Sequence, residues 1–315
     1  MDRFQRILVG ITNTEADLYL LRYAALVARL SGAGRVCFAH VLPHGRDGLA
    51  GEGVIPARER TMAALEALVE THFTGLAPET QTVIDVLKAP LVNRSLDYAV
   101  EQEVDLVLVG HRRSLRLLAR RLAMSAPCSV WMVPEKSPAA FHRILVPVDF
   151  SPHSAHALRL AVSLAHRGGA VKCCVLHVTP TEPALLHEYP DTFSQDRERE
   201  ELRQLVASVG APDVQFELLF ETGRNVPETI LRVAAEQQAD LIVIGTRGHG
   251  ASAAVRLGSA AEHTIIHSRF PVLAVKEFGA RLGVLESLLE KSCRPGMAWS
   301  PPSISLPPVH KGMNR

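Results

Sequence analysis

The segment DLIVIGTRGHGASAAVRLGS, residues 240–259, joins a short apolar run to a loop that holds four glycines and ends in a serine. A continuous apolar run of this length is typical of a strand that is buried on both faces of a parallel sheet. Glycine allows positive φ and lets a ligand approach the backbone closely, because no Cβ stands in the way. The segment therefore predicts a buried strand followed by a loop shaped for close approach.

An earlier part of the chain repeats this strand. The segment EQEVDLVLVG, residues 101–110, aligns with EQQADLIVIG, residues 236–245. Likewise RILVGI, residues 6–11, aligns with RILVPV, residues 143–148. Similarity at one large offset indicates a duplicated domain, since the repeats of solenoids and propellers are only about 20–50 residues long.

The duplication predicts two α/β domains, over residues 1–138 and 139–278. Each copy alternates short apolar strands with amphipathic helices, and the second copy begins its first helix at Ser151 and Pro152, which are typical N-cap and first-turn residues. Doubly buried strands joined by helices predict a doubly wound, five-stranded parallel sheet of order 3-2-1-4-5 in each domain. Residues 279–315 are expected to hold one short helix and a disordered tail rich in proline and serine.

In such a sheet, ligands bind beyond the carboxyl ends of the strands, where the strand order reverses between strands 1 and 4. Asp149 ends strand 1 and Gly245 ends strand 4, so a carboxylate and the glycine loop flank one crevice. Gly258 and Ser259 then open a helix, whose first N–H groups favour an anion. We expect a nucleotide here, with Asp149 near a sugar or base donor. The alternative, that the glycines only shape turns, stays open.

At these residues the chain resembles the universal stress protein family, in its tandem form with two domains in one polypeptide. ATP-binding members carry the pattern Gly-x2-Gly-x9-Gly-(Ser/Thr), which Gly245, Gly248, Gly258 and Ser259 match. The segments ILVPVDFS, VLHV and PVLAVK resemble the first, second and last strands of the family. The resemblance covers residues 4–277 and implies a Rossmann-like fold of the adenine-nucleotide alpha-hydrolase kind.

The resemblance also implies which residues contact the nucleotide, with Asp149 on the adenine side. The implied cofactor is ATP, or the related AMP or ADP, with or without Mg²⁺. Thr246 and Arg247 lie between matched glycines, and from this position we expect them to line the phosphates. The other implied contacts are Pro147, Val148, Asp149, Val178, Ile244, Gly245, Gly248, Gly258, Ser259 and Ala260.

The first copy departs from the family pattern at each decisive place. Thr12 stands in place of Asp149, and Arg113 in place of Gly248. In the same alignment Ala123 replaces Gly258 and Met124 replaces Ser259. The first copy is also shorter in this region, and we expect the missing residues to remove most of the helix that would face the phosphates. The first copy is therefore predicted to fold without binding ATP in the manner of the family.

The function that the resemblance implies is a role in stress response or signalling, through nucleotide-dependent contacts with a protein partner that the sequence does not identify. Family members pair through their last strands, so the two copies are expected to form an internal pseudo-dimer, and a homodimer of the chain is a further expectation. Two alternatives stay open. One is slow ATP hydrolysis or phosphotransfer, for which His249 and Asp149 are the candidate bases. The other is a scaffold without nucleotide.

Composition limits the other classes of function. The formal net charge is +1, which argues against a nucleic-acid or anionic membrane partner. No apolar stretch approaches the ~20 residues of a membrane span, and the start lacks the apolar core of a signal peptide, so we expect a cytoplasmic protein. The five cysteines form no CxxC pair and are expected to be reduced and buried.

An arginine-rich segment, residues 112–121, follows the strand of the first copy. We expect a solvated basic helix face, with Leu115, Leu118 and Leu122 turned inward. A patch for nucleic acid or an acidic partner is the alternative.

Overall fold

The computed structural model describes residues 4–42, 57–88, 91–111, 116–168, 172–181, 195–211, 213–248 and 257–276. The expectations for Arg113, Leu115, His249 and the tail after residue 278 lie outside these residues.

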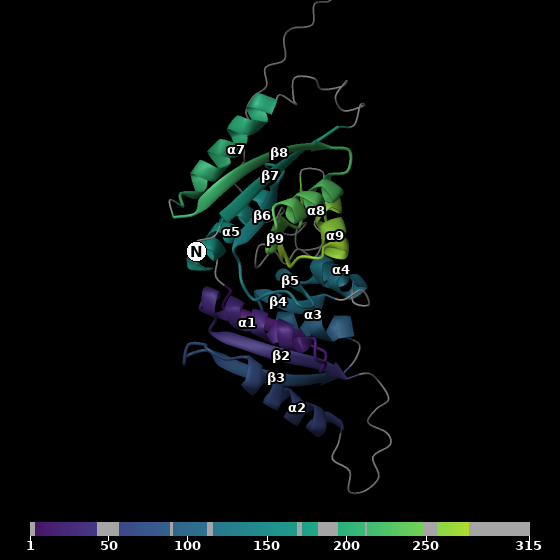
Figure 1. Ribbon diagram of the computed structural model, residues 1–315. Helices are drawn as coiled ribbons and strands as arrows, with labels where there is room; N and C mark the ends of the chain where they lie inside the picture. The colour runs from purple at the N-terminus through teal and green to yellow at the C-terminus, as the bar shows by residue number, and fades with distance from the viewer. Residues whose placement is uncertain are drawn as a thin grey trace, which may run out of the picture. The chain divides into compact units, whose positions relative to one another are not determined.

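The chain forms two successive sets of alternating strands and helices (Figure 1). We call them the first and second domains. The first domain holds β1 (Arg6–Ile11), α1 (Asp17–Ser31), β2 (Arg35–Leu42), α2 (Ala57–His72), β3 (Gln81–Lys88), α3 (Leu91–Glu101), β4 (Leu106–His111), α4 (Arg116–Ser125) and β5 (Ser129–Pro134). The second holds β6 (Arg143–Val148), α5 (Pro152–Gly168), β7 (Lys172–Pro180), α7 (Gln195–Val209), β8 (Gln215–Gly223), α8 (Val226–Glu236), β9 (Leu241–Gly245), α9 (Ser259–His267) and β10 (Val272–Val275).

The strands lie in one ten-stranded sheet of order β3-β2-β1-β4-β5-β10-β9-β6-β7-β8. Each half has the predicted order 3-2-1-4-5, and all neighbours within a half are parallel. The halves meet at β5 and β10, which pair antiparallel, with Leu273 opposite Trp131. The two expected sheets are thus continuous with each other through their last strands.

Helices cover both faces of the sheet, because the side chains of each strand alternate between two apolar clusters. Ile144 and Val146 of β6 join the cluster that α1, α2, α5 and α7 complete. Leu145 of the same strand faces the cluster that α3, α4, α8 and α9 complete. A strand buried on both faces must be apolar throughout, which is why its sequence reads as a continuous apolar run.

Repeated polar residues fix the strand ends in both domains. Asp105 accepts hydrogen bonds from the N–H groups of Gln5 and Arg6, at 2.6 and 3.1 Å, and Asp240 accepts from His142 and Arg143 at 2.7 and 2.9 Å. Burial raises the pKa of Asp105 to about 6. The aspartate shared by the two aligned segments therefore has a structural role, since it ties β4 to β1 and β9 to β6.

Histidines at equivalent positions of the two domains bind the backbone, and the expectation for the cysteines is confirmed. The Nδ1 atoms of His40 and His177 lie 3.0 and 2.9 Å from the carbonyl oxygens of Ile11 and Val148, so these equivalent histidines bind the backbone. The four cysteines in the described part of the chain are free and buried. None of the described helices combines the length and apolar character that crossing a membrane requires.

Candidate functional site

The two central strands of the second domain, β6 and β9, are paired only near their N-terminal ends. β6 pairs with β9 only at Ile144–Leu241 and Leu145–Ile242. In the first domain, the equivalent ladder between β1 and β4 continues to the pair Gly10–Val109. Pro147 stands where the first domain has Gly10, and proline has no N–H to donate to a ladder. The sheet of the second domain therefore opens at its switch point, beyond the carboxyl ends of β6 and β9.

A cavity of about 560 Å³ occupies this opening. Its volume lies within the range of about 300–1,000 Å³ that is usual for small-molecule sites. The structure brings to it all of the sequence-predicted site residues except Thr246. These are Pro147, Val148, Asp149, Val178, Ile244, Gly245, Arg247, Gly248, Gly258, Ser259 and Ala260.

The carboxylate of Asp149 is held in place at the end of β6. Its Oδ1 accepts a hydrogen bond from the N–H of Ser151 at 3.1 Å, and its own N–H donates to the hydroxyl of Ser154 at 3.4 Å. Ser151 caps α5 as predicted, accepting from the N–H of Ser154 at 3.2 Å. Phe150, between these residues, has a φ of 62° and turns the chain into the helix. The start of α5 thus orients Asp149 toward the crevice.

Two of the motif glycines pack against protein atoms. A Cβ on Gly248 would lie 2.3 Å from Oδ2 of Asp149. A Cβ on Gly245 would lie 2.9 Å from the backbone carbon and oxygen of His153. Both distances are too short for a real Cβ, so Gly245 lets α5 approach β9, and Gly248 lets the loop lie against Asp149. This role differs from the close ligand approach that we expected of every glycine.

Gly258 is different, because a Cβ there would come no closer than 3.6 Å to any described atom. Gly258 is the N-cap of α9, and no side chain caps this helix end. The next three residues, Ser259, Ala260 and Ala261, line the cavity. Their N–H groups belong to the first turn, where no intrahelical acceptor exists, so this end of α9 favours an anion.

Thr246 anchors the loop and does not line the cavity. Its N–H and its hydroxyl both donate to the carbonyl oxygen of Val275, at 3.2 and 3.1 Å. Its own carbonyl accepts from the N–H of Gly258 at 2.8 Å. The side chain that we expected at the phosphates is therefore buried against β10, and the Thr246 backbone joins the two ends of the loop.

The cavity is also lined by six residues that the sequence analysis did not predict. One of them, Leu176, shares a face of β7 with Val178 and could have been found from the period of two. Val226 and Ile230 are four residues apart on α8, but the family motif does not include that helix. The six are Ser154, Leu176, Val226, Ile230, Leu257 and Ala261.

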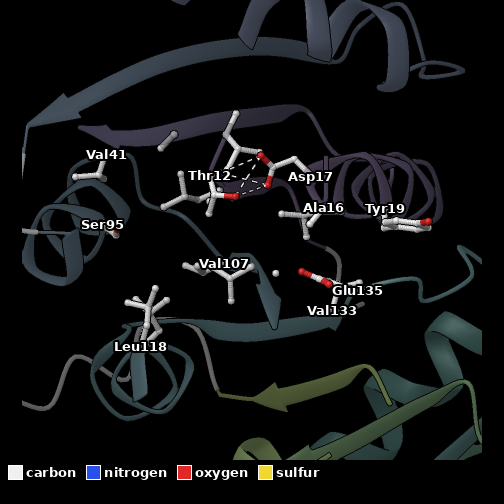
Figure 2. Close-up of a pocket in the computed structure, with 18 of the residues that line it drawn as sticks. Thr12, Ala16, Asp17, Tyr19, Val41, Ser95, Val107, Leu118, Val133 and Glu135 are labelled. Atoms are coloured by element: carbon white, nitrogen blue, oxygen red, sulfur yellow. Dashed lines mark hydrogen bonds between the residues drawn. The ribbon is translucent and has the colours of Figure 1, made fainter. Parts of the chain in front are cut away.

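The first domain has a cavity at the equivalent place, but it is only about 80 Å³ (Figure 2). Its walls are mostly apolar and include Val107 and Leu118. Two carboxylate side chains, Asp17 and Glu135, are among its described lining residues. At this volume it is too small for a nucleotide, and among the residues that the structure describes its lining holds no lysine or arginine.

Thr12 takes the place of Asp149 in this cavity, and Asp17 satisfies its polar groups. Oδ2 of Asp17 accepts from the N–H groups of Thr12 and Thr14, at 3.1 and 2.8 Å, and Oδ1 accepts from the Thr12 hydroxyl at 3.1 Å. Figure 2 shows the bonds between Thr12 and Asp17 at one side of the cavity. The polar groups at the end of β1 are therefore used within the protein.

Replacing Asp17 with alanine is expected to destabilise the protein by about 1–3 kcal/mol, because the N–H groups of Thr12 and Thr14 lose a buried acceptor. Urea unfolding measures the change. Glu15→Ala is the control, since Glu15 is exposed on the same turn. Equal unfolding midpoints for the two variants would show that Asp17 does not hold this turn.

The expectation of a missing helix in the first domain is wrong. α4 is present over Arg116–Ser125, and residues 112–115 replace the longer connection 246–258 of the second domain. Ala123 and Met124 lie in the second half of α4, so they do not correspond to Gly258 and Ser259 at the start of α9. The shortening removes the glycine loop and keeps the helix, and α4 supplies buried side chains to the core.

Comparisons with known proteins agree with this architecture. The sequence profile of the Universal stress protein family matches the chain twice, at residues 3–134 and 140–276. A universal stress protein of Thermus aquaticus is 34% identical over 140 residues, which cover 43% of this chain and 99% of that protein.

Two solved structures share the fold over most of the chain. The crystal structure of a universal stress protein from Archaeoglobus fulgidus superposes with a TM-score of 0.62 at 16% identity, and covers 86% of this chain and 96% of its own. The crystal structure of a functionally unknown protein from Pseudomonas aeruginosa PAO1 superposes with a TM-score of 0.65 at 21% identity, and covers 91% and 98%. At these identities the likeness concerns the fold.

Proposed function

The chain belongs to the universal stress protein family, and on this premise we propose that its second domain binds one molecule of ATP, or of the related ADP or AMP, between β6 and β9. The observation that carries the proposal is the crevice of about 560 Å³, which brings Asp149, Arg247 and the N-terminus of α9 together. An acceptor at one side and two features that favour an anion at the other match the two ends of a nucleotide.

The base and sugar fit the side of the crevice near β6, β7 and α8. Val148, Val178 and Ile230 supply apolar surface there. Asp149 lines the crevice at this side and supplies a carboxylate acceptor. Adenine and ribose both carry donors that a carboxylate accepts.

The phosphates fit the side near β9 and α9. Gly258 carries no side chain at the N-terminus of α9, where the N–H groups of the first turn favour a phosphate oxygen. Ser259 adds a hydroxyl donor, and Arg247 adds positive charge. In this proposal, Mg²⁺ arrives with the phosphates and is held chiefly by them.

The proposed division of labour gives nucleotide binding to residues 139–278 and a supporting role to residues 1–138. The first domain pairs its β5 with β10, next to Val275 and the anchored Thr246. We propose that nucleotide binding controls contacts between this chain, acting as a monomer or a homodimer, and a protein partner in the stress response. The setting proposed is the cytoplasm, where thiols stay reduced, in keeping with the free buried cysteines.

Calorimetric titration of the Asp149→Asn variant tests the proposal. The amide keeps an oxygen for the N–H of Ser151 but replaces the other acceptor with a donor, so we expect about a 10- to 100-fold loss of ATP affinity. Thr12→Ala, at the equivalent position of the first domain, is the control and is expected to bind as the wild type does. Equal affinity of both variants would contradict the proposed orientation of the nucleotide.

A further inference from the structure

We infer that the first domain contributes a residue to the nucleotide site of the second: Arg120 neutralises Glu262 beside the phosphate-facing turn of α9. The inference rests on the proposed function. It assigns a role to α4, an arginine-rich helix that lies outside the glycine motif. The site of the second domain is then incomplete without the first domain.

Glu262 is placed where it opposes a polyphosphate. It lies in the first turn of α9, and its N–H donates to the carbonyl of Gly258 at 2.8 Å. The residues just before it, Ser259, Ala260 and Ala261, line the cavity. A carboxylate near a helix N-terminus stabilises the helix, but the same negative charge repels an anion bound at that end. The carboxylate of Glu262 thus stabilises the helix but weakens the binding of an anionic ligand.

Arg120 of the first domain forms an ion pair with Glu262 of the second. Its Nε donates to Oε1 of Glu262 at 2.5 Å. The two side chains are 38% and 31% exposed, so water only partly screens their interaction. A charge-assisted hydrogen bond of this kind holds the carboxylate against α4 and cancels its charge next to the phosphates.

A second contact between the domains holds α4 in position. Lys276, which follows β10, extends its Nζ to the carbonyl oxygens of Met124 and Ala126 at 3.1 and 2.8 Å. These carbonyls lie at the C-terminal end of α4, where a cation is favoured. The backbone N–H of Lys276 also donates to the hydroxyl of Ser129 at 3.1 Å. The second domain therefore fixes one end of α4. This contact keeps Arg120, on the same helix, within reach of Glu262.

The charge of the ligand provides the distinguishing test. If Arg120 acts by cancelling a negative charge, its loss weakens ATP most, AMP less and adenosine not at all, because repulsion grows with the charge of the ligand. If Arg120 only supports the shape of the crevice, its loss weakens all three ligands equally. Arg121 is exposed on the same helix and offers a matched control.

The experiment titrates ATP, AMP and adenosine into the full chain and into four variants: Arg120→Gln, Glu262→Gln, the double variant and Arg121→Gln. We expect Arg120→Gln to weaken ATP about tenfold, an effect typical of one uncompensated charge near a ligand. Adenosine affinity stays unchanged. Glu262→Gln binds ATP as tightly as the wild type or more tightly, the double variant recovers to within about twofold of the wild type, and Arg121→Gln is unaffected.

Three results would overturn the inference alone: wild-type ATP affinity in Arg120→Gln, an equal loss for adenosine, or a double variant as weak as Arg120→Gln. A wild-type chain that binds none of the three ligands overturns the proposed function, and this inference with it. Melting temperatures of the variants, taken in the same buffer, separate a loss of affinity from a loss of fold.

Discussion

Replacing Gly248 with alanine is expected to weaken ATP binding about 10- to 100-fold while the protein stays folded. The new Cβ would lie 2.3 Å from Oδ2 of Asp149, so the carboxylate must turn away from the crevice. The far end of a side chain moves at little cost to the fold, but its contact with the nucleotide is lost. Gly248→Arg, which copies Arg113 of the first domain, is expected to abolish binding. Calorimetric titration measures both effects.

A double-mutant cycle shows whether this loss acts through Asp149. If it does, adding Gly248→Ala to Asp149→Ala weakens ATP no further, because the displaced carboxylate is already absent. Additive losses would mean that Gly248 contacts the nucleotide on its own account. Unchanged affinity in Gly248→Ala alone would remove Asp149 from the site.

Gly245→Ala and Gly110→Ala are expected to change stability in opposite directions, although the two glycines are equivalent in the repeat. A Cβ on Gly245 would lie 2.9 Å from backbone atoms of His153, which cannot rotate away. Overpacking of this kind costs about 1–3 kcal/mol. A Cβ on Gly110 meets no atom of the described residues within 4 Å. Because Gly110 lies in β4 without positive φ, alanine there is expected to stabilise by about 0.5–1 kcal/mol.

Urea unfolding of the two variants, compared by midpoint at equal slope, measures this difference. Each variant is the matched control of the other. Equal shifts in the two midpoints would contradict the close approach of α5 to β9 in the second domain. Thermal shift with ATP adds a second readout, since Gly245→Ala also displaces the start of α5, which holds Asp149.

Much of the fold follows from local patterns in the sequence. Continuous apolar runs mark β6 and β9 as strands buried on both faces, and the repeat transfers the strand order from one domain to the other. Ser151 and Pro152 mark the start of α5 because capping depends on neighbouring residues alone. The residues at the strand ends could also be predicted to lie at the crevice, because the carboxyl ends of parallel strands meet at one edge of the sheet.

Features that depend on distant contacts could not be predicted. The roles of Gly245 and Gly248 come from His153 and Asp149, which the fold brings to them from another strand and helix. The alignment of Ala123 with Gly258 failed because the shortening falls in a loop, where no periodic pattern marks its place. Two helices with similar apolar spacing can then be shifted by two turns without an apparent mismatch.

The placement of Thr246 shows the same limit on a smaller scale. A threonine between two motif glycines suggests a phosphate ligand, but its hydroxyl meets the carbonyl of Val275 on a strand far along the chain. The ion pair of Arg120 with Glu262 joins two domains and leaves no pattern within either one.

Calorimetric titration of ATP, with Mg²⁺, into the intact chain tests the proposed nucleotide site of the second domain. The open crevice between β6 and β9 and the small cavity beside Thr12 predict one site per chain. Two sites would contradict the assignment of the first domain as a non-binding copy. No heat of binding, together with no thermal shift, would contradict nucleotide binding in the second domain, and the motif glycines would then serve only the packing of α5 and Asp149 against β9.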